Sequence, residues 1–212
     1  MRITIICSSS EHPVNAWLQR WIAANGDVHE ISLLRRIEEI AGGDILFLIS
    51  CTQIVTAEHR ALFDCTLVIH ASDLPLGRGW SPHVWAIAQG AEQIAVTLLE
   101  AEDKVDSGAI WGQLRLDIPR HFLSGEINAA LFDAELQLMD LAISLHGTNP
   151  GVPQRTDIEP SYLPKRTRDD SRVDPSLSIA EQFDLIRVCD PERFPAFFEI
   201  HGHRYKIILE KI

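Results

Sequence analysis

Apolar and polar positions along the chain fall into two patterns, short continuous apolar runs and longer stretches with apolar residues at helical spacing. The apolar runs predict buried strands, and they lie at residues 45–49, 65–69 and 94–99. Strands are also predicted at the β-branched run 2–7, at the short segment 28–32 and at 109–116. The helical spacing predicts helices at 13–26, 33–41, 56–63, 81–90 and 127–145. This alternation predicts a doubly wound, mostly parallel α/β sheet, with 109–116 as an edge strand.

The last third of the chain has a different pattern. Residues 146–160 are rich in Gly, Pro, Asn and Thr, which is typical of a linker. Ser178 and Glu181 form a capping box that opens a helix to about Cys189, and residues 197–212 predict a hairpin that turns at Gly202. We therefore predict a domain at 1–148 and, at 149–212, a linker with a small helix-plus-hairpin appendage. The appendage is expected to pack beside the rim of the site or to form a subunit contact.

Composition and charge limit the classes of partner. The 212-residue chain has a formal net charge of −11, which disfavours a broad surface for nucleic acid or anionic membranes. Its apolar runs are too short to span a membrane, so a cytoplasmic location is expected. The four cysteines are scattered without metal-ligand spacing, so we expect reduced thiols and no metal site; they are Cys7, Cys51, Cys65 and Cys189.

Polar residues follow several of the predicted strands. Ser50 and Cys51 come after one apolar run, His70 ends another, and Asp106 lies in the loop after residues 94–99. Ligands of open α/β sheets bind beyond the carboxyl ends of the strands, so we expect these groups to lie close together. A histidine at a strand end is more often structural than catalytic. Asp106 is a carboxylate that could fix its tautomer and raise its pKa.

The residues after His70 strengthen the catalytic interpretation. The stretch from His70 to Pro82 reads HASDLPLGRGWSP, and it resembles the His-x-Ser-x-Leu-Pro-x-x-Arg-Gly signature of formyltransferases that use 10-formyltetrahydrofolate. Asp106 precedes Ser-Gly and follows His70 by 36 residues, as the second motif of that family does. The segment YLPKRTRDDS at 162–171 is similar to the sugar N-formyltransferase branch.

The resemblance implies a Rossmann-like formyltransferase fold and an enzyme of one-carbon group transfer. The formyl donor would be 10-formyltetrahydrofolate, a folate, and the acceptor the primary amine of a sugar nucleotide. A UDP-linked 4-amino-4,6-dideoxy sugar is the expected acceptor, for example an altrosamine precursor of formylated pseudaminic acid in surface polysaccharide biosynthesis. Two alternatives stay open, a phosphoribosylglycinamide-type formyltransferase and a non-catalytic folate-binding module. A homodimer is also an open alternative.

The chemistry of formyl transfer explains the residue types. An amine that attacks a formyl carbon produces an oxyanion and a cationic nitrogen, so the site needs a hydrogen-bond donor and a proton acceptor. The resemblance assigns His70 and Asp106 as the catalytic residues. It assigns six residues to the folate donor: Ser72, Leu74, Pro75, Arg78, Gly79 and Val105. It assigns three to the sugar nucleotide: Trp80, Tyr162 and Arg166. The basic cluster around Arg166 could equally be a solvated charge run.

One position departs from the family pattern. The family places an asparagine two residues before the histidine, and this chain has Val68 there. Gln53, Thr66 and Ser72 are the candidates to supply the missing hydrogen bond. The other readings are that the histidine suffices alone or that the chain binds folate without catalysis. One strand-helix unit before His70 is also expected to be shortened or missing.

Overall fold

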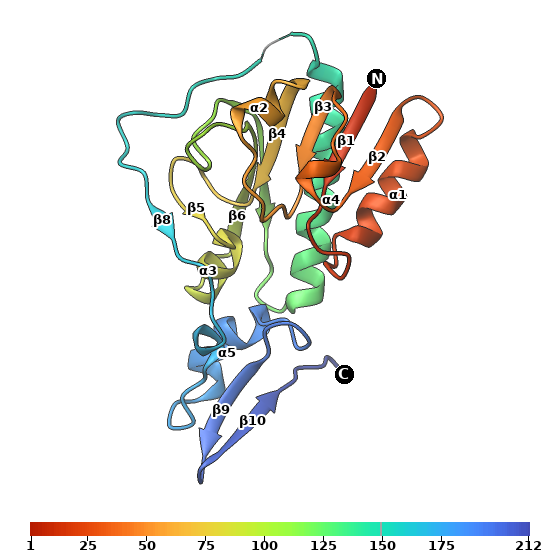
Figure 1. The fold of residues 1–212 in the computed structure, drawn as a ribbon. Coiled ribbons are helices and arrows are strands. Elements are labelled where there is room, and N and C mark those ends of the chain that lie inside the picture. The colour runs from red at the N-terminus through yellow and green to blue at the C-terminus, as the bar shows by residue number, and fades with distance from the viewer. Residues whose placement is uncertain (149) are drawn as a thin grey trace.

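A six-stranded sheet forms the centre of the larger part of the molecule (Figure 1). The computed structural model describes residues 1–148 and 150–212, so Asn149, where the second predicted domain begins, lies outside the described residues. The strand order is β2-β1-β3-β4-β6-β7. The strands are β1 (Arg2–Ile6), β2 (Glu30–Leu34), β3 (Gly43–Leu48), β4 (Phe63–His70), β6 (Gln93–Glu100) and β7 (Ile110–Asp117).

The direction of the strands agrees with the predicted class. β2, β1, β3 and β4 pair in parallel, whereas β6 is antiparallel to both β4 and β7. The prediction of a mostly parallel α/β sheet is therefore confirmed, with β7 at one edge. The carboxyl ends of β1, β3 and β4 point toward the smaller lower part of the molecule (Figure 1).

Helices cover the two faces of the sheet unequally. The helices are α1 (Asn15–Asn25), α2 (Ala57–Arg60), α3 (Pro82–Ala88), α4 (Ser124–Leu145) and α5 (Ile179–Val188), with 3-10 turns η1 (Ile37–Glu39) and η2 (Asp169–Ser171). α1 and α4 lie over one face, where Leu131, Leu138 and Ala142 of α4 join Phe47 and Leu67 in the largest apolar cluster. The predicted apolar stripe of α4 is thus part of the core.

The opposite face has a thinner cover, and here two predicted helices are wrong. Leu33 and Leu34 belong to β2, because they pair with Ile5 and Ile6 of β1, so the helix predicted at 33–41 is reduced to the η1 turn. The helix predicted at 56–63 is reduced to α2, and Phe63 instead begins β4. In both places strand pairing outweighs local helical spacing.

Two further pairs of strands complete the fold. β5 (Arg78–Gly79) pairs in parallel with β8 (Tyr162–Leu163), which follows the predicted linker. β9 (Ala196–Ile200) and β10 (His203–Ile207) form the predicted hairpin, with a positive φ of 79° at Gly202 in its turn. The predicted capping box is confirmed, because Ser178 accepts a hydrogen bond from the Glu181 amide at the start of α5.

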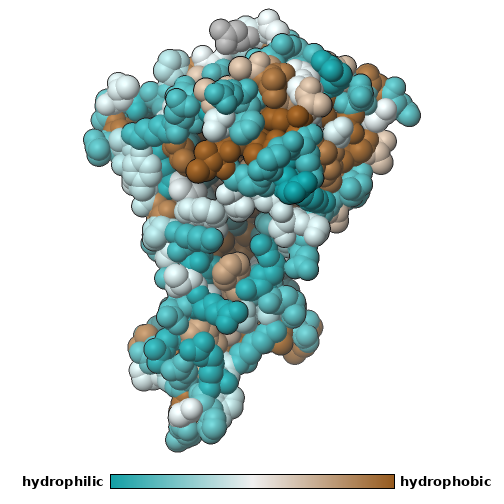
Figure 2. All heavy atoms as spheres, viewed as in Figure 1, coloured by the Kyte–Doolittle hydropathy of each residue, from teal (hydrophilic) through white to brown (hydrophobic). Residues whose placement is uncertain are grey.

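The appendage, formed by α5, β9 and β10, lies below the sheet (Figure 1). The space-filling view shows a narrow waist between the two parts, with a recess at its centre (Figure 2). Arg187 of α5 joins them: its side chain is fully buried, pairs with Asp184 at 2.6 Å and donates to the carbonyls of Pro119 and Phe122. Within the described residues, no helix is both long and apolar enough to cross a membrane.

We expect Arg187→Ala to lower the free energy of unfolding by about 3 to 5 kcal/mol, because it leaves Asp184 and two carbonyls without their buried partner. Arg172→Ala is the matched control in the same appendage, since its ion pair with Glu199 is largely exposed and exposed pairs contribute little. Urea unfolding of both variants is the measurement. Equal losses in the two variants would contradict the assigned role of Arg187.

Candidate active site

His70 stands at the carboxyl end of β4, at the border between the sheet and the waist. It is 7% exposed, and its Nε2 atom lies 2.8 Å from the Gly77 carbonyl oxygen and 3.6 Å from Oδ2 of Asp106. A carbonyl oxygen can only accept a hydrogen bond, so Nε2 carries the proton and Nδ1 is the acceptor nitrogen of the neutral ring. The tautomer of His70 is thereby assigned from its partners.

The signature loop, residues 71–80, folds back over the end of β4. Thr97 of β6 is fully buried and donates to the Ser72 carbonyl at 2.7 Å, which anchors the start of the loop. At its other end, a Cβ on Gly79 would lie 2.5 Å from the Leu163 carbonyl oxygen, and Gly79 has φ 102°. Only glycine therefore allows β8 to pair this closely with the loop.

Asp106 reaches His70 by a longer path than the sequence suggested. Because β6 is antiparallel to β4, its last residue, Glu100, lies beside Leu67 rather than beside His70. The prediction that Asp106 meets His70 at neighbouring carboxyl strand ends is wrong in this respect. The aspartate loop, residues 101–109, runs back along β4 instead. Asp106 has φ 54°, and its Oδ2 accepts the Gly79 amide at 2.9 Å.

The structure brings most of the predicted site residues to this region. Ser72 and Leu74 are buried in the signature loop, and Arg78 is 5% exposed. Pro75 follows Leu74 through a cis peptide bond, and Val105 is an exposed neighbour of Asp106.

The three residues predicted to bind the sugar nucleotide are placed differently from one another. Tyr162 accepts a hydrogen bond from Arg78 at 3.1 Å, and Arg78 followed by Lys104 lowers the pKa of its phenol. Trp80 is 41% exposed, with Lys165 over its ring. Arg166 turns into the appendage, where it donates to Ser171 at 3.0 Å. Its role at the site stays a prediction.

Several contributing residues were not found from the sequence. Gln154, in the predicted linker, and Ser161, just after it, bind the two loops. The Ser161 hydroxyl accepts from the Gly77 amide at 2.8 Å, and Gln154 contacts Arg78 and Asp106. His12, in the loop after β1, lies 3.3 Å from the hydroxyl of Ser50. A polar residue between glycines and prolines gives no signal for such long-range contacts.

Three titratable groups near the sheet's carboxyl edge, the half-buried His12 and His83 and the buried Glu135, are held uncharged at neutral pH. Burial, with a smaller contribution from Arg193, lowers the pKa of His12 to about 4. Burial, followed by the charges of His70 and Arg166, lowers the pKa of His83 to about 4. Burial raises the pKa of Glu135 on α4 to about 8, and its Oε2 has no hydrogen-bond partner among the described residues.

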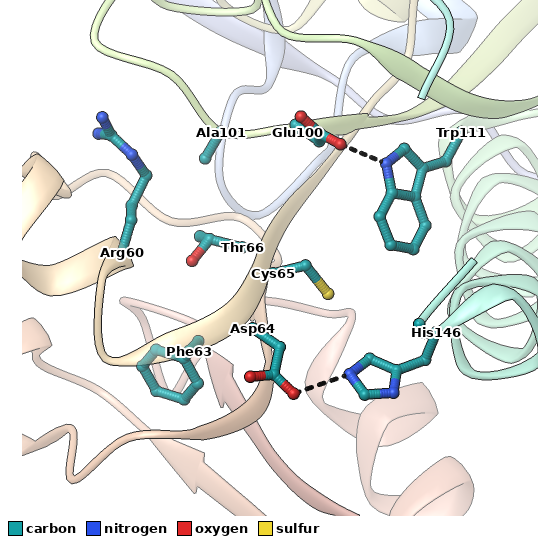
Figure 3. A pocket seen from close by; sticks show the side chains of 10 residues that line it. Arg60, Phe63, Asp64, Cys65, Thr66, Glu100, Ala101, Trp111 and His146 are labelled. Atoms are coloured by element: carbon teal, nitrogen blue, oxygen red, sulfur yellow. Dashed lines mark hydrogen bonds and ion pairs between the residues drawn. The ribbon is translucent and has the colours of Figure 1, made fainter. Parts of the chain in front are cut away.

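A cavity of about 500 Å³ lies along the amino-terminal half of β4, and neither His70 nor Asp106 lines it. It opens where the β4 and β6 ladder, which begins at Leu67, leaves the start of β4 unpaired on that side. Figure 3 shows Arg60, Thr66, Glu100 and Trp111 around it, and Glu100 accepts the Trp111 indole N–H at 2.7 Å. Thr66 is 6% exposed, and its hydroxyl has no partner in the described part of the chain. The described residues hold no cluster of three metal-ligating side chains.

Comparison with known proteins identifies the family. The formyl transferase family model matches residues 5–143. A methionyl-tRNA formyltransferase of Natranaerobius thermophilus is 33% identical over 147 residues, which are 68% of this chain and 46% of that protein. One of Lactobacillus johnsonii is 28% identical over 141 residues, 66% of this chain and 44% of that protein. The chain thus spans about half the length of the curated relatives it matches.

Solved structures share the fold. A methionyl-tRNA formyltransferase from Clostridium thermocellum matches with TM-score 0.79 and 21% identity, over 96% of this chain and 90% of that one. A sugar N-formyltransferase from Shewanella matches with TM-score 0.73 and 16% identity, over 100% of this chain and 99% of that one. HypX from Aquifex aeolicus, in complex with tetrahydrofolic acid, matches with TM-score 0.78 and 22% identity, over 96% of this chain and 36% of that one.

The buried carboxyl group of Glu135 predicts a pH dependence of stability. Its pKa is about 8 in the folded protein against an ordinary 4.5, so the folded state binds the proton more tightly than the unfolded state. The free energy of unfolding should therefore fall as the pH rises between these two values, by up to about 1.4 kcal/mol per pH unit.

Glu135→Gln should remove this loss, because the amide does not ionise. The measurement is urea unfolding of both proteins at about pH 5 and about pH 8. Asp133→Asn, an exposed position on the same helix, should keep the wild-type pH dependence. An unchanged pH dependence in Glu135→Gln would show that the carboxyl group is not buried as described.

Proposed function

The chain belongs to the formyl transferase family, and from this premise we propose that it transfers a formyl group from 10-formyltetrahydrofolate to the primary amine of a nucleotide-linked amino sugar. The observation that carries the proposal is the buried pair of His70 and Asp106, 3.6 Å apart, with side chains 9% and 7% exposed. A histidine and a carboxylate in a low-dielectric environment can move a proton and stabilise the charge that results.

The geometry suggests how the pair would act. With Nε2–H bound to the Gly77 carbonyl, Nδ1 is the ring atom available to the substrates. The amine attacks the formyl carbon and the new C–N bond forms, while the amine proton passes to Nδ1 of His70, directly or through water. The imidazolium, stabilised by Asp106, would donate from Nδ1 to the oxyanion. The C–N10 bond then breaks, and the proton returns to the departing nitrogen.

A second donor to the oxyanion is needed in place of the amide missing at Val68. Gln53 is not available, because its amide already binds the Ile37 amide, the Ser8 hydroxyl and the Arg35 carbonyl. Thr66 lies four residues before His70 on β4, about 13 Å away along the strand. The buried Ser72 hydroxyl lacks a partner among the described residues and lies two residues from His70. Ser72 is therefore the preferred candidate.

The cavity beside β4 fits the ring system of the donor. A pterin carries N–H donors, a carbonyl group and a flat face. The cavity offers the carboxylates of Asp64 and Glu100, the Trp111 indole and the Thr66 hydroxyl, which has no partner among the described residues. The aspartate loop connects this cavity to His70. The formyl-bearing arm would therefore pass between that loop and the signature loop, where Ser72, Leu74, Pro75, Arg78, Gly79 and Val105 are the proposed contacts.

The proposed acceptor site combines aromatic rings with positive charge. Trp80 lies beneath Lys165, whose Nζ is 4.9 Å from the ring centroid, and Lys104 Nζ is 5.9 Å from the Tyr162 ring. In a chain of net charge −11, such a grouping would hold a nucleobase by stacking and a diphosphate by charge. Fold neighbours among sugar N-formyltransferases match the whole chain, which supports this acceptor.

Methionyl-tRNA is the second candidate acceptor, because the curated relatives are methionyl-tRNA formyltransferases. The deciding experiment supplies the purified protein with 10-formyltetrahydrofolate and a panel of acceptors. These are UDP- and dTDP-linked 4-amino-4,6-dideoxy sugars, glycinamide ribonucleotide and methionyl-tRNA, with the formylated product measured by mass spectrometry. Formylation of a sugar nucleotide alone supports the proposal. Preferred formylation of either other acceptor replaces it, and folate binding without product identifies a binding module.

We expect His70→Ala and Asp106→Asn each to lower kcat for the formylated acceptor by roughly a hundredfold or more, because each removes charge stabilisation in the transition state. Glu102→Gln is the matched control, an exposed carboxylate in the same aspartate loop, and should keep wild-type kcat. Steady-state kinetics on the three variants is the measurement. Retention of kcat in both site variants would reject the assigned pair.

We expect Thr66→Val to raise the dissociation constant of tetrahydrofolate by up to about tenfold, because it removes one hydrogen-bonding group without changing the shape of the cavity. Thr66→Ser keeps the hydroxyl and should bind as the wild type does. Isothermal titration calorimetry is the measurement. Equal affinity in all three proteins would place the pterin outside this cavity.

A further inference from the structure

The segment from residue 152 to residue 163, the strap, crosses the outside of the candidate active site. It leaves the sheet where Val152 pairs with Ile110 of β7 through two backbone hydrogen bonds of 2.8 and 2.9 Å. It then passes the two loops and ends as β8, which pairs with β5 (Figure 1). The strap is therefore fixed at both ends, and its middle is held against the aspartate loop.

Gln154 lies at the middle of the strap and uses its whole amide group. Its Oε1 accepts a hydrogen bond from Arg78 Nη2 at 2.6 Å. Its Nε2 donates to the carbonyls of Asp106 at 2.8 Å and Gly108 at 3.0 Å. One acceptor facing a guanidinium and two donors facing carbonyls are a pattern that an amide satisfies and a carboxylate does not.

The backbone that Gln154 holds needs support. Asp106 has φ 54°, a left-handed conformation that is unfavourable for a residue with a Cβ. The loop is also pressed against β6, since a Cβ on Gly108 would lie 2.0 Å from the Glu100 carbonyl oxygen. Gln154 donates its two hydrogen bonds to the carbonyls of Asp106 and Gly108, on either side of Ser107. They fix the turn that aims the Asp106 carboxylate at Gly79 and His70.

The hydrogen bond between Gln154 and Arg78 also connects the signature loop to the strap. The Arg78 guanidinium is buried, and its Nε has no hydrogen-bond partner within the described ranges. Gln154 and Tyr162 are its partners. The backbone amide of the next residue, Gly79, binds the Asp106 carboxylate. Gln154 thus ties the signature loop and the aspartate loop together from outside.

We propose that Gln154 is a positioning residue for formyl transfer, which holds Asp106 in the left-handed conformation that places its carboxylate beside His70. This inference rests on the proposed function. Gln154 touches neither substrate in it, and acts through the backbone of Asp106. The strap is thereby a part of the reaction centre rather than a passive connection to the appendage.

The test compares two substitutions of the same length. Gln154→Met removes every polar contact, while Gln154→Glu keeps an acceptor for Arg78 and loses both donors to the aspartate loop. If the donors position Asp106, both variants lose kcat by about tenfold to a hundredfold, as misplacement of a reacting group by about 1 Å does. Both KM values should stay close to wild type, because the substrate contacts are intact. Arg155→Ala, at an exposed neighbouring position of the strap, should keep wild-type kinetics.

Three results would overturn the inference. Wild-type kcat in Gln154→Met would show that the contact is dispensable. Wild-type kcat in Gln154→Glu alone would assign the effect to Arg78. A raised KM with unchanged kcat would make Gln154 a binding residue. If the wild type itself formylates no acceptor, the proposed function fails, and crystal structures of the wild type and Gln154→Met still decide the placement. The inference expects the Asp106 carboxylate to leave the Gly79 amide in the variant, and an unmoved carboxylate rejects it.

Discussion

The candidate site depends on the contact between the Asp106 carboxylate and the His70 imidazole, although the strand before Asp106 ends far from His70. Because β6 is antiparallel to β4, the polypeptide leaves the sheet beside the middle of β4 and must return along it before Asp106 meets His70. A left-handed residue makes this return possible, and hydrogen bonds from Gly79 and Gln154 keep it in place. The unusual conformation at Asp106 is thus sustained by groups from two distant segments, as strained functional residues generally are.

The two faces of the sheet that carries this pair are covered differently. One face of the sheet is covered by α1 and α4, where Trp21 donates to Asp140 at 2.7 Å and joins the two helices. Among the described residues, the other face is covered by the η1 turn, the short helix α2 and loops. Unequal cover of this kind separates the rigid support from the part that can accept ligands.

Much of the fold could be predicted from the sequence, because the continuous apolar runs at 45–49, 65–69 and 94–99 became the central strands β3, β4 and β6. The signature after His70 likewise pointed to Asp106 through its spacing. The direction of β6 could not be predicted, since an apolar run does not indicate whether a strand is parallel or antiparallel to its neighbour. The segment 33–41 was misread because Leu33 and Leu34 fit both spacings and pairing with β1 decided between them. Gln154 carried no signal, because its partners lie 76 and 48 residues away.

The strap also constrains how such a chain can diversify. Its residues cover the outer side of the candidate active site before the polypeptide continues into the appendage, so the strap and the appendage form one continuous stretch of chain. An appendage exchanged between relatives at the boundary after α4 would carry a foreign strap with it, and the glutamine and serine that meet the two loops would change in the same event. A successful exchange therefore has to take place after β8, or the loops and the strap have to be inherited together.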